Sequence, residues 1–215
     1  MSARGAVCLE GFHALKHAIR FGAKLLEVRT DDTSRLAALA RELAPDVADE
    51  IVARAEKGPG PFPPTGVMSW AERPAPRELG AGLVVLLDHP RRLGNVGAAI
   101  RVAAAADAAG VVVTGDADPW HRQAVRGAAG LQFALPIADE APAGRPLVAL
   151  DPEGDPLDGI PPDAVLAFGS ERRGLSPEVL ERADARVALP MRPGVSSLNL
   201  ATAVAATLYS ASASR

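Results

Sequence analysis

Polar side chains and glycines occur together in short segments of this 215-residue chain, a combination that suits ligand binding. One segment is DHPRRLGNVGAAIR at residues 88–101, which contains Asn95 and Arg101. Another is FGSERRG at residues 168–174, in which Glu171 stands between two glycines. Glycine lets a phosphate or another backbone come close, a carboxylate accepts from a hydroxyl or amine, and a guanidinium binds phosphate. These residue types indicate a site for a phosphorylated or hydroxylated ligand.

A third segment, ALPMRPGVSSLNLAT at residues 188–202, leads from an expected strand into the last expected helix. Ser196 or Ser197 suits the N-cap of that helix, and Asn95 suits the N-cap of an earlier one. Each segment taken alone also fits a capped helix or a charged surface turn. A dinucleotide-binding fingerprint and a Walker lysine loop are both absent from the sequence, so a generic nucleotide-binding protein is disfavoured.

The elements around these segments indicate an α/β fold. Continuous apolar runs alternate with helical patterns, as in a mostly parallel sheet that helices cover on both faces. The expected strands are 83–87, 111–113, 133–135, 147–150, 165–168 and 187–189, and the expected helices are 95–109, 120–126, 177–183 and 198–211.

A stretch rich in Pro and Gly, KGPGPFPPTG at residues 57–66, divides the chain, and a second soft region follows at 72–82. Neither can continue a helix or occupy a central strand. We therefore expect two domains, residues 1–75 and residues 76–215. The front domain reads as a small α/β unit, with helices over 10–21, 33–43 and 47–56 and strands over 25–28 and 66–70.

Composition excludes several classes of protein. Apolar residues make up 48% of the chain and charged residues 23%, which favours a folded core over disorder. No apolar run approaches the ~20 residues that span a bilayer, and the N-terminus lacks a signal-peptide core, so we expect a cytoplasmic protein. Cys8 is the only cysteine and the four histidines form no ligand pattern, so we expect no metal site.

The net charge of −3 argues against binding nucleic acid by charge alone. A local basic patch is still compatible with that balance. In the front domain, Lys16, Arg20 and Lys24 are close in sequence and offer such a patch for RNA. Arg172, in FGSERRG, is a further candidate for contact with RNA phosphates.

The order NVGAAIR, FGSERRG and LPMRPGVSSLNLATAVA resembles the three motifs of the SpoU–TrmH branch of SPOUT methyltransferases. This resemblance covers residues 83–210. The front segments EGFHALKHAI and TGVMSWAERP are similar to the ribosomal-protein-like substrate-binding domain that often precedes such a catalytic domain.

The resemblance implies a C-terminal deep trefoil knot and a homodimer in which each active site is completed near the partner subunit. It also implies S-adenosylmethionine as the cofactor. By motif position, the backbone of Gly169, Leu189 and Leu198 would hold the cofactor, with Met191 nearby.

The family reaction is methylation of a ribose 2′-hydroxyl. By resemblance, Arg101 is the catalytic arginine, and the other polar site positions are Asn95, Glu171, Ser197 and Asn199. Arg101 would act either as a base, assisted by the target phosphate, or as a charged group that orients the phosphate and stabilises the developing alkoxide. Glu171 would hold Arg101 or Asn95 in place.

Large-subunit ribosomal RNA is the expected substrate, because the front domain is often missing from simpler relatives that modify tRNA. A tRNA ribose methyltransferase is the enzymatic alternative. The other alternative is a non-catalytic RNA-binding or ribosome-assembly factor that kept the fold. The sequence departs from the family after Asn199, where it has Leu-Ala-Thr in place of the usual Val-Ser pair, so any polar contact made there by the family is in doubt.

Overall fold

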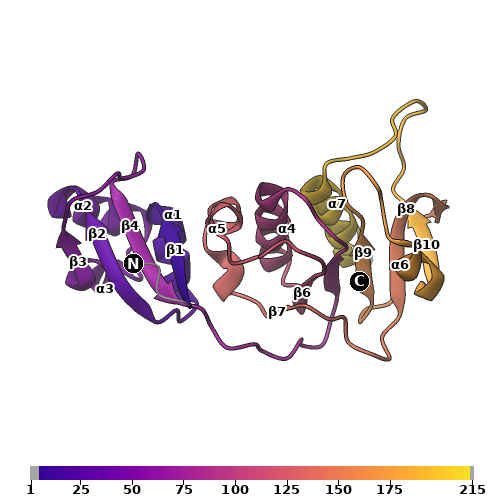
Figure 1. Ribbon diagram of the computed structural model, residues 1–215, viewed down its shortest axis with the longest axis horizontal. Coiled ribbons are helices and arrows are strands. Elements are labelled where there is room, and N and C mark those ends of the chain that lie inside the picture. Colours follow the sequence, from indigo (N-terminus) through magenta and orange to yellow (C-terminus); the bar gives the residue numbers. More distant parts are fainter. Residues whose placement is uncertain (1–4, 214–215) are drawn as a thin grey trace.

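The computed structural model describes residues 5–213, which form two sheets with their helices (Figure 1). The front sheet is mixed and has the strand order β1-β4-β2-β3, with β2 and β3 parallel and the other pairs antiparallel. Its strands are β1 (Ala6–Glu10), β2 (Leu25–Thr30), β3 (Ala55–Lys57) and β4 (Val67–Glu72). The sequence predicted β2 and β4 but missed β1 and β3, which are short edge strands.

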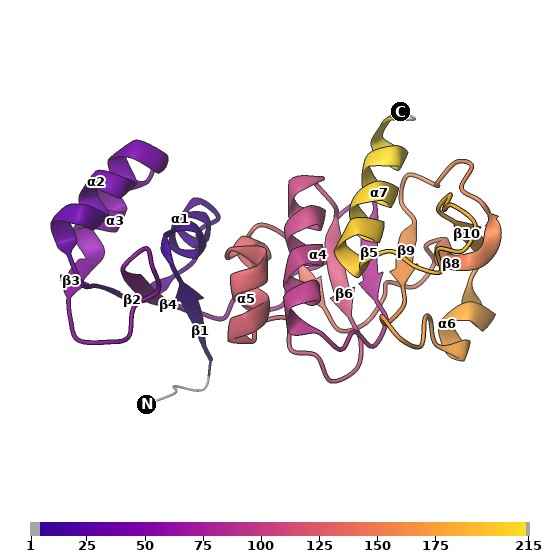
Figure 2. The same cartoon turned by 90° about the horizontal axis from the view of Figure 1, so that it is seen from above.

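Three helices cover one face of this sheet and leave the other face uncovered by any helix (Figure 2). They are α1 (Phe12–Arg20), α2 (Thr33–Leu43) and α3 (Ala48–Arg54). Alternate strand residues such as Val7 and Leu9 point into the core, which also contains Leu15 of α1 and Ile51 of α3. This alternation is typical of a sheet with one buried face.

The second sheet is parallel throughout and has the strand order β10-β8-β9-β5-β6-β7. Its strands are β5 (Val84–Leu87), β6 (Gly110–Val113), β7 (Ile137–Ala138), β8 (Leu147–Pro156), β9 (Val165–Phe168) and β10 (Ala185–Ala188). Every residue of β5, β6 and β9 is buried, because helices cover both faces. The predicted α/β class and mostly parallel sheet are therefore confirmed.

Helices α4 (Leu93–Ala105) and α7 (Leu200–Ala213) pack together on one face of the parallel sheet, and α6 (Pro177–Arg182) covers the other (Figures 1 and 2). Helix α5 (Arg122–Ala128) packs on α4 and lies between the two sheets. Among the described residues, no helix is long and apolar enough to cross a bilayer. The trefoil knot and the domain boundary at residue 75 stay predictions.

The predicted strand over residues 133–135 is wrong. A 3-10 helix, η1 (Leu131–Phe133), occupies this region, and β7 begins only after Pro136. Gly130 starts the turn with φ 78°, and the Phe133 side chain enters the core of the front domain, where its ring packs edge-on against Trp120 at 5.3 Å. Phe133 therefore serves contact between the domains, a role that local β propensity does not reveal.

The two halves of the molecule meet along α1 and β1 on one side and α5 and η1 on the other. Nδ1 of His17 donates to the carbonyl of Ala129 at 2.8 Å, and a Cβ on Gly130 would lie 2.6 Å from the Ala14 carbonyl oxygen. Glu10, with a side chain only 7% exposed, forms ion pairs with Arg122 and Arg126 of α5. This close packing and the ion pairs to the buried Glu10 carboxylate fix the front domain against α5.

A buried carboxylate organises the edge of the parallel sheet at which the predicted site segments begin. Asp88 follows β5 and is 2% exposed. It accepts from the Ser176 backbone N–H at 2.6 Å and the Thr114 hydroxyl at 3.2 Å, and it bonds Nδ1 of His89 at 2.7 Å. Burial by itself raises the pKa of Asp88, but the bonds from Ser176 and His89 outweigh it and hold the pKa below its usual value.

We expect Asp88→Asn to lower the free energy of unfolding by about 1.5–3 kcal/mol at pH 7, because bonds to a charged acceptor are lost. Since the folded pKa of Asp88 is depressed, its contribution is present above the unfolded pKa of about 3.9 and is lost as the pH falls through the folded pKa. Urea denaturation at neutral pH and below pH 4 measures both effects. Asp163→Asn, at an exposed site, is the matched control, and equal stability of the two variants at pH 7 contradicts the assignment.

Candidate active site

Hydrogen bonds between three polar side chains join the three predicted segments. The amide nitrogen of Asn95 donates to Glu171 Oε1 at 2.7 Å, and that of Asn199 donates to Asn95 Oδ1 at 3.4 Å. Asn95 is in α4, Glu171 follows β9, and Asn199 precedes α7. Residues that lie 104 positions apart in the sequence are thus brought into direct contact.

Neither of the predicted helix N-caps is correct, Asn95 for α4 or Ser196 or Ser197 for α7. Helix α4 begins two residues before Asn95, after Arg92, so the Asn95 side chain is free to bond Glu171. At α7 the capping bond comes from Asn199, whose Oδ1 accepts from the Ala201 N–H at 3.0 Å. Asn199 therefore has two partners, and capping fixes its side chain toward Asn95.

The Glu171 loop is a tight turn that closes on itself. Ser170 and Gly174 exchange two backbone hydrogen bonds of 2.9 and 3.0 Å, and Gly174 has φ 67°, which favours glycine. At the start of the turn, Gly169 lies directly against the backbone at its end. A Cβ on Gly169 would be 2.1 Å from the Gly174 carbonyl carbon. Glycine at position 169 is thus a steric requirement of the turn.

A pocket of about 380 Å³ lies between this turn, the end of β8 and the 189–198 loop, within the size range of small-molecule sites. All four residues that the resemblance assigns to the cofactor line it: Gly169, Leu189, Met191 and Leu198. Ser197 and Glu171 also line it. Two further lining residues, Asp151 and Pro152, were missed, although both lie near the carboxyl end of the buried part of β8, where ligands of parallel sheets bind.

The pocket fits S-adenosylmethionine. Its walls are largely apolar, from Leu150, Phe168 and Met191 among others, which suits an adenine ring. The absence of a side chain at Gly169 leaves backbone groups within reach of a ligand. Glu171 Oε2 is buried and has no hydrogen-bond partner among the described residues, so it can accept a bond from a ligand.

Arg101 is the one predicted catalytic residue that neither joins the hydrogen bonds among Asn95, Glu171 and Asn199 nor lines the pocket. It is exposed on α4, does not line the pocket, and makes no hydrogen bond or ion pair with any residue that the structure describes. Its charge acts on two residues of the front domain. The pKa of His13 is lowered by burial first, then by Lys16 and Arg101, and Arg101 also contributes to the lowered pKa of Lys16. Glu171 therefore holds Asn95 and not Arg101.

The residues predicted to contact RNA differ in whether an acidic side chain pairs with them. Arg20 makes two bonds of 2.6 Å to Asp46, and Lys24 pairs with Glu72 at 2.6 Å. Lys16 has no acidic partner within ion-pair distance among the described residues, and its pKa is lowered by burial and by the nearby charges of Arg20 and Arg101. Arg172 is exposed beside Glu171.

In the part of the chain that the structure describes, no group of three His, Cys, Asp or Glu side chains is arranged to hold a metal ion.

The fold is a parallel α/β sheet joined to a small α/β domain, with a ligand pocket at the carboxyl ends of the parallel strands. This arrangement is typical of two-domain enzymes that bind a nucleotide or another cofactor. Residues 82–209 match the family described as SpoU rRNA Methylase, and the chain belongs to this family. It is an RNA methyltransferase by that membership, and the resemblance found in the three segments is confirmed.

Relatives match nearly the whole chain. The 23S rRNA (adenosine(1067)-2′-O)-methyltransferase of Streptomyces laurentii is 34% identical over 94% of this chain and 84% of its own length. The 23S rRNA (uridine(2479)-2′-O)-methyltransferase of Streptomyces viridochromogenes is 32% identical over 96% and 82%. The crystal structure of the SpoU methyltransferase AviRb from Streptomyces viridochromogenes, in complex with AdoMet, superposes with a TM-score of 0.78 at 28% identity and covers 99% of this chain and 91% of that one.

We expect Gly169→Ala to weaken S-adenosylmethionine binding by about tenfold or more, which corresponds to about 1.4 kcal/mol. The added Cβ cannot fit against the backbone of residues 174 and 175, so the turn must shift away from the pocket. Calorimetric titration with the cofactor measures the change. Gly80→Ala, whose Cβ would make only ordinary contacts of 3.8 Å, is the matched control. Unchanged affinity in Gly169→Ala would place the cofactor elsewhere.

Proposed function

We propose that this protein transfers a methyl group from S-adenosylmethionine to a ribose 2′-hydroxyl of 23S ribosomal RNA in the cytoplasm. The observation that carries this proposal is the Asn95–Glu171–Asn199 cluster beside a pocket that fits the cofactor. Family membership and the names of the full-length relatives support the substrate.

The proposed chemistry divides between the bound cofactor and the side chains of this chain. S-adenosylmethionine supplies a methyl group activated by a sulfonium. Asn199 and Ser197 position the ribose at the pocket, and Glu171 holds the Asn95 amide in a fixed orientation. A guanidinium stays protonated in proteins, so Arg101 acts as a cation that orients the target phosphate and stabilises negative charge on the 2′-oxygen while the hydroxyl proton passes to solvent water.

A second copy of the chain completes the proposed site. Helix α7 has no charged residue along its length, and Arg101 is the only one in α4. Tyr209 of α7 and Val195 and Leu198 of the loop before it are large apolar side chains that are more than 40% exposed. An uncharged helix pair with exposed apolar groups is typical of a surface that another subunit covers. In such a homodimer, Arg101 of one protomer would lie at the pocket of its partner.

The direct test incubates the protein with labelled S-adenosylmethionine and unmodified 23S rRNA or tRNA transcripts, followed by mass spectrometry of the nucleosides. We expect a 2′-O-methylnucleoside from 23S rRNA. Arg101→Ala should lower the transfer rate by about 100-fold or more while leaving cofactor affinity within about twofold, because the lost interaction forms only in the transition state. Arg101→Lys keeps the charge and should retain more activity. Methylation of tRNA alone would show that tRNA, and not 23S rRNA, is the substrate. Near-normal turnover of Arg101→Ala would refute the role of Arg101.

The homodimer makes a separate prediction. Arg101→Ala and Asn199→Ala should each be inactive alone. Mixing equal amounts of the two during refolding or co-expression makes about half of the dimers mixed, and each mixed dimer has one site with both wild-type residues, so the mixture should recover about a quarter of the wild-type activity. Transfer assays on the mixture measure this recovery. Size-exclusion chromatography with light scattering must show a dimer for both variants. No recovery in a demonstrated mixed dimer would place Arg101 and Asn199 in the same protomer's site.

A further inference from the structure

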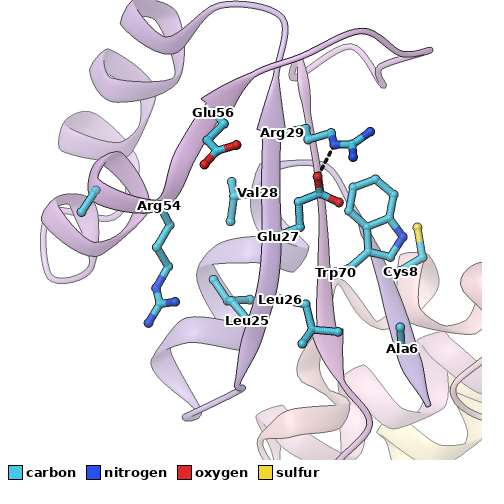
Figure 3. Close-up of a pocket in the computed structure, with 11 residues that line it drawn as sticks. Ala6, Cys8, Leu25, Leu26, Glu27, Val28, Arg29, Arg54, Glu56 and Trp70 are labelled. Atoms are coloured by element: carbon cyan, nitrogen blue, oxygen red, sulfur yellow. Dashed lines mark hydrogen bonds and ion pairs between the residues drawn. The ribbon is translucent and has the colours of Figure 1, made fainter. Parts of the chain in front are cut away.

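The face of the front sheet that no helix covers carries a tryptophan at its centre. Cys8, Trp70 and Glu27 lie side by side across β1, β4 and β2, and their side chains project from this face (Figure 3). The Arg29 guanidinium lies 5.6 Å from the centre of the Trp70 ring and also bonds Glu27. An aromatic ring and a guanidinium are thus held together on a partly exposed surface.

A groove of about 630 Å³ continues from Trp70 toward α5. One wall is the Pro-rich loop over residues 59–64, which includes Phe62; the floor is Met68 and Trp70; and the far wall is formed by Arg122 and Arg126. The Pro-rich composition restricts this loop, because each proline fixes its own φ.

The charge that this groove presents to solvent is positive. The side chains of Arg122 and Arg126 are 64% and 66% exposed, and that of Arg29 is 43% exposed. Glu10, the acidic residue that lines the groove, is 7% exposed and lies beneath Arg122 and Arg126. It therefore orients the two guanidinium groups while leaving their outer N–H groups available to an anion.

From these observations we propose that the groove binds a single-stranded RNA segment, with a base stacked on Trp70 and Phe62 and its flanking phosphates on Arg122 and Arg126. The inference rests on the proposed function, since it assigns the groove to a part of the same RNA substrate. Aromatic rings bind any base through their faces and arginines bind phosphates, so this combination suits single strands, whose bases are unstacked.

The position of the groove agrees with one RNA reaching both domains. The Pro-rich loop and the loop between β10 and α7 both project from the upper edge of the molecule in Figure 1, and the latter borders the cofactor pocket. Arg122 and Arg126 belong to α5, which packs on α4 and so connects the groove to the helix that carries Asn95. A segment bound here would lie at the other end of the molecule from the nucleotide that enters the active site, with α5, α4 and α7 between them (Figure 1).

Trp70 provides the reporter for the test. The chain has two tryptophans, and Trp120→Phe removes the other one while keeping an aromatic ring against Phe133. In this variant, a ten-nucleotide oligouridylate should quench Trp70 fluorescence saturably. In the unaltered protein, a 4-thiouridine oligonucleotide should crosslink to the peptides that contain Phe62 or Trp70, as mapped by mass spectrometry.

Two variants test the separate parts of the groove by fluorescence anisotropy. Trp70→Leu should raise the Kd for oligouridylate about tenfold, because one stacking platform is removed. Glu10→Gln combined with Arg122→Gln and Arg126→Gln removes the cations without leaving a buried carboxylate unpaired. The slope of log Kd against log salt concentration should become shallower by about 0.7 for each phosphate that the variant no longer neutralises. Arg41→Gln, at an exposed cation on α2, is the matched control and should change neither quantity.

Binding without quenching of Trp70, or crosslinks that map only to other peptides, would overturn the proposal. Quenching by oligoglutamate but not by oligouridylate would overturn it too, because the groove would then fit an acidic peptide. If the protein methylates 23S rRNA and these tests fail, the groove assignment alone is wrong. Failure of methyl transfer to RNA would instead overturn the proposed function.

Discussion

The hydrogen bonds to the buried Asp88 carboxylate set the geometry of the catalytic half of the molecule. Asp88 directly follows β5 and begins the first polar segment. Ser176, whose backbone N–H donates to Asp88, lies two residues after the second segment and its turn. The 2.6 Å bond between them fixes where both loops leave the sheet. Burying a carboxylate is costly, and donors from three segments offset that cost. With the loops anchored in this way, Asn95 can meet Glu171 at 2.7 Å.

The parts of the fold that could be predicted are those with a strong local pattern. Continuous apolar runs identified β5 and β9, because a strand covered on both faces buries every side chain. The order of the three polar segments indicated the family, and the structure places all four predicted cofactor residues on one pocket. Edge strands β1 and β3 and the 3-10 helix at Phe133 escaped prediction, because tertiary contacts and not local propensity decide them.

The candidate site was only partly predictable for a related reason. Residue types identified Asn95 and Asn199, but their roles were misread or left open because capping depends on where a helix begins. Helix α4 starts earlier than its polar pattern suggests, so Asn95 bonds Glu171 in place of its own backbone. Asp88 begins the first segment, but the sequence assigned it no role. Its function follows from long-range contacts with Thr114 and Ser176, and a pair of residues 88 positions apart cannot be inferred from spacing.

Ion pairing explains how an acidic protein can present a cationic site. Most basic side chains of the front domain are neutralised by carboxylates, as Arg20 is by Asp46 and Lys24 by Glu72. Around the active site the pattern is reversed, for none of five exposed arginines forms an ion pair with a described residue. These are Arg91, Arg92, Arg101, Arg172 and Arg173. An unpaired guanidinium is free to bind phosphate, whereas the charge of a paired one is partly compensated by its carboxylate. The net charge of −3 therefore describes the surface as a whole, and the field that an RNA would meet at the site is positive.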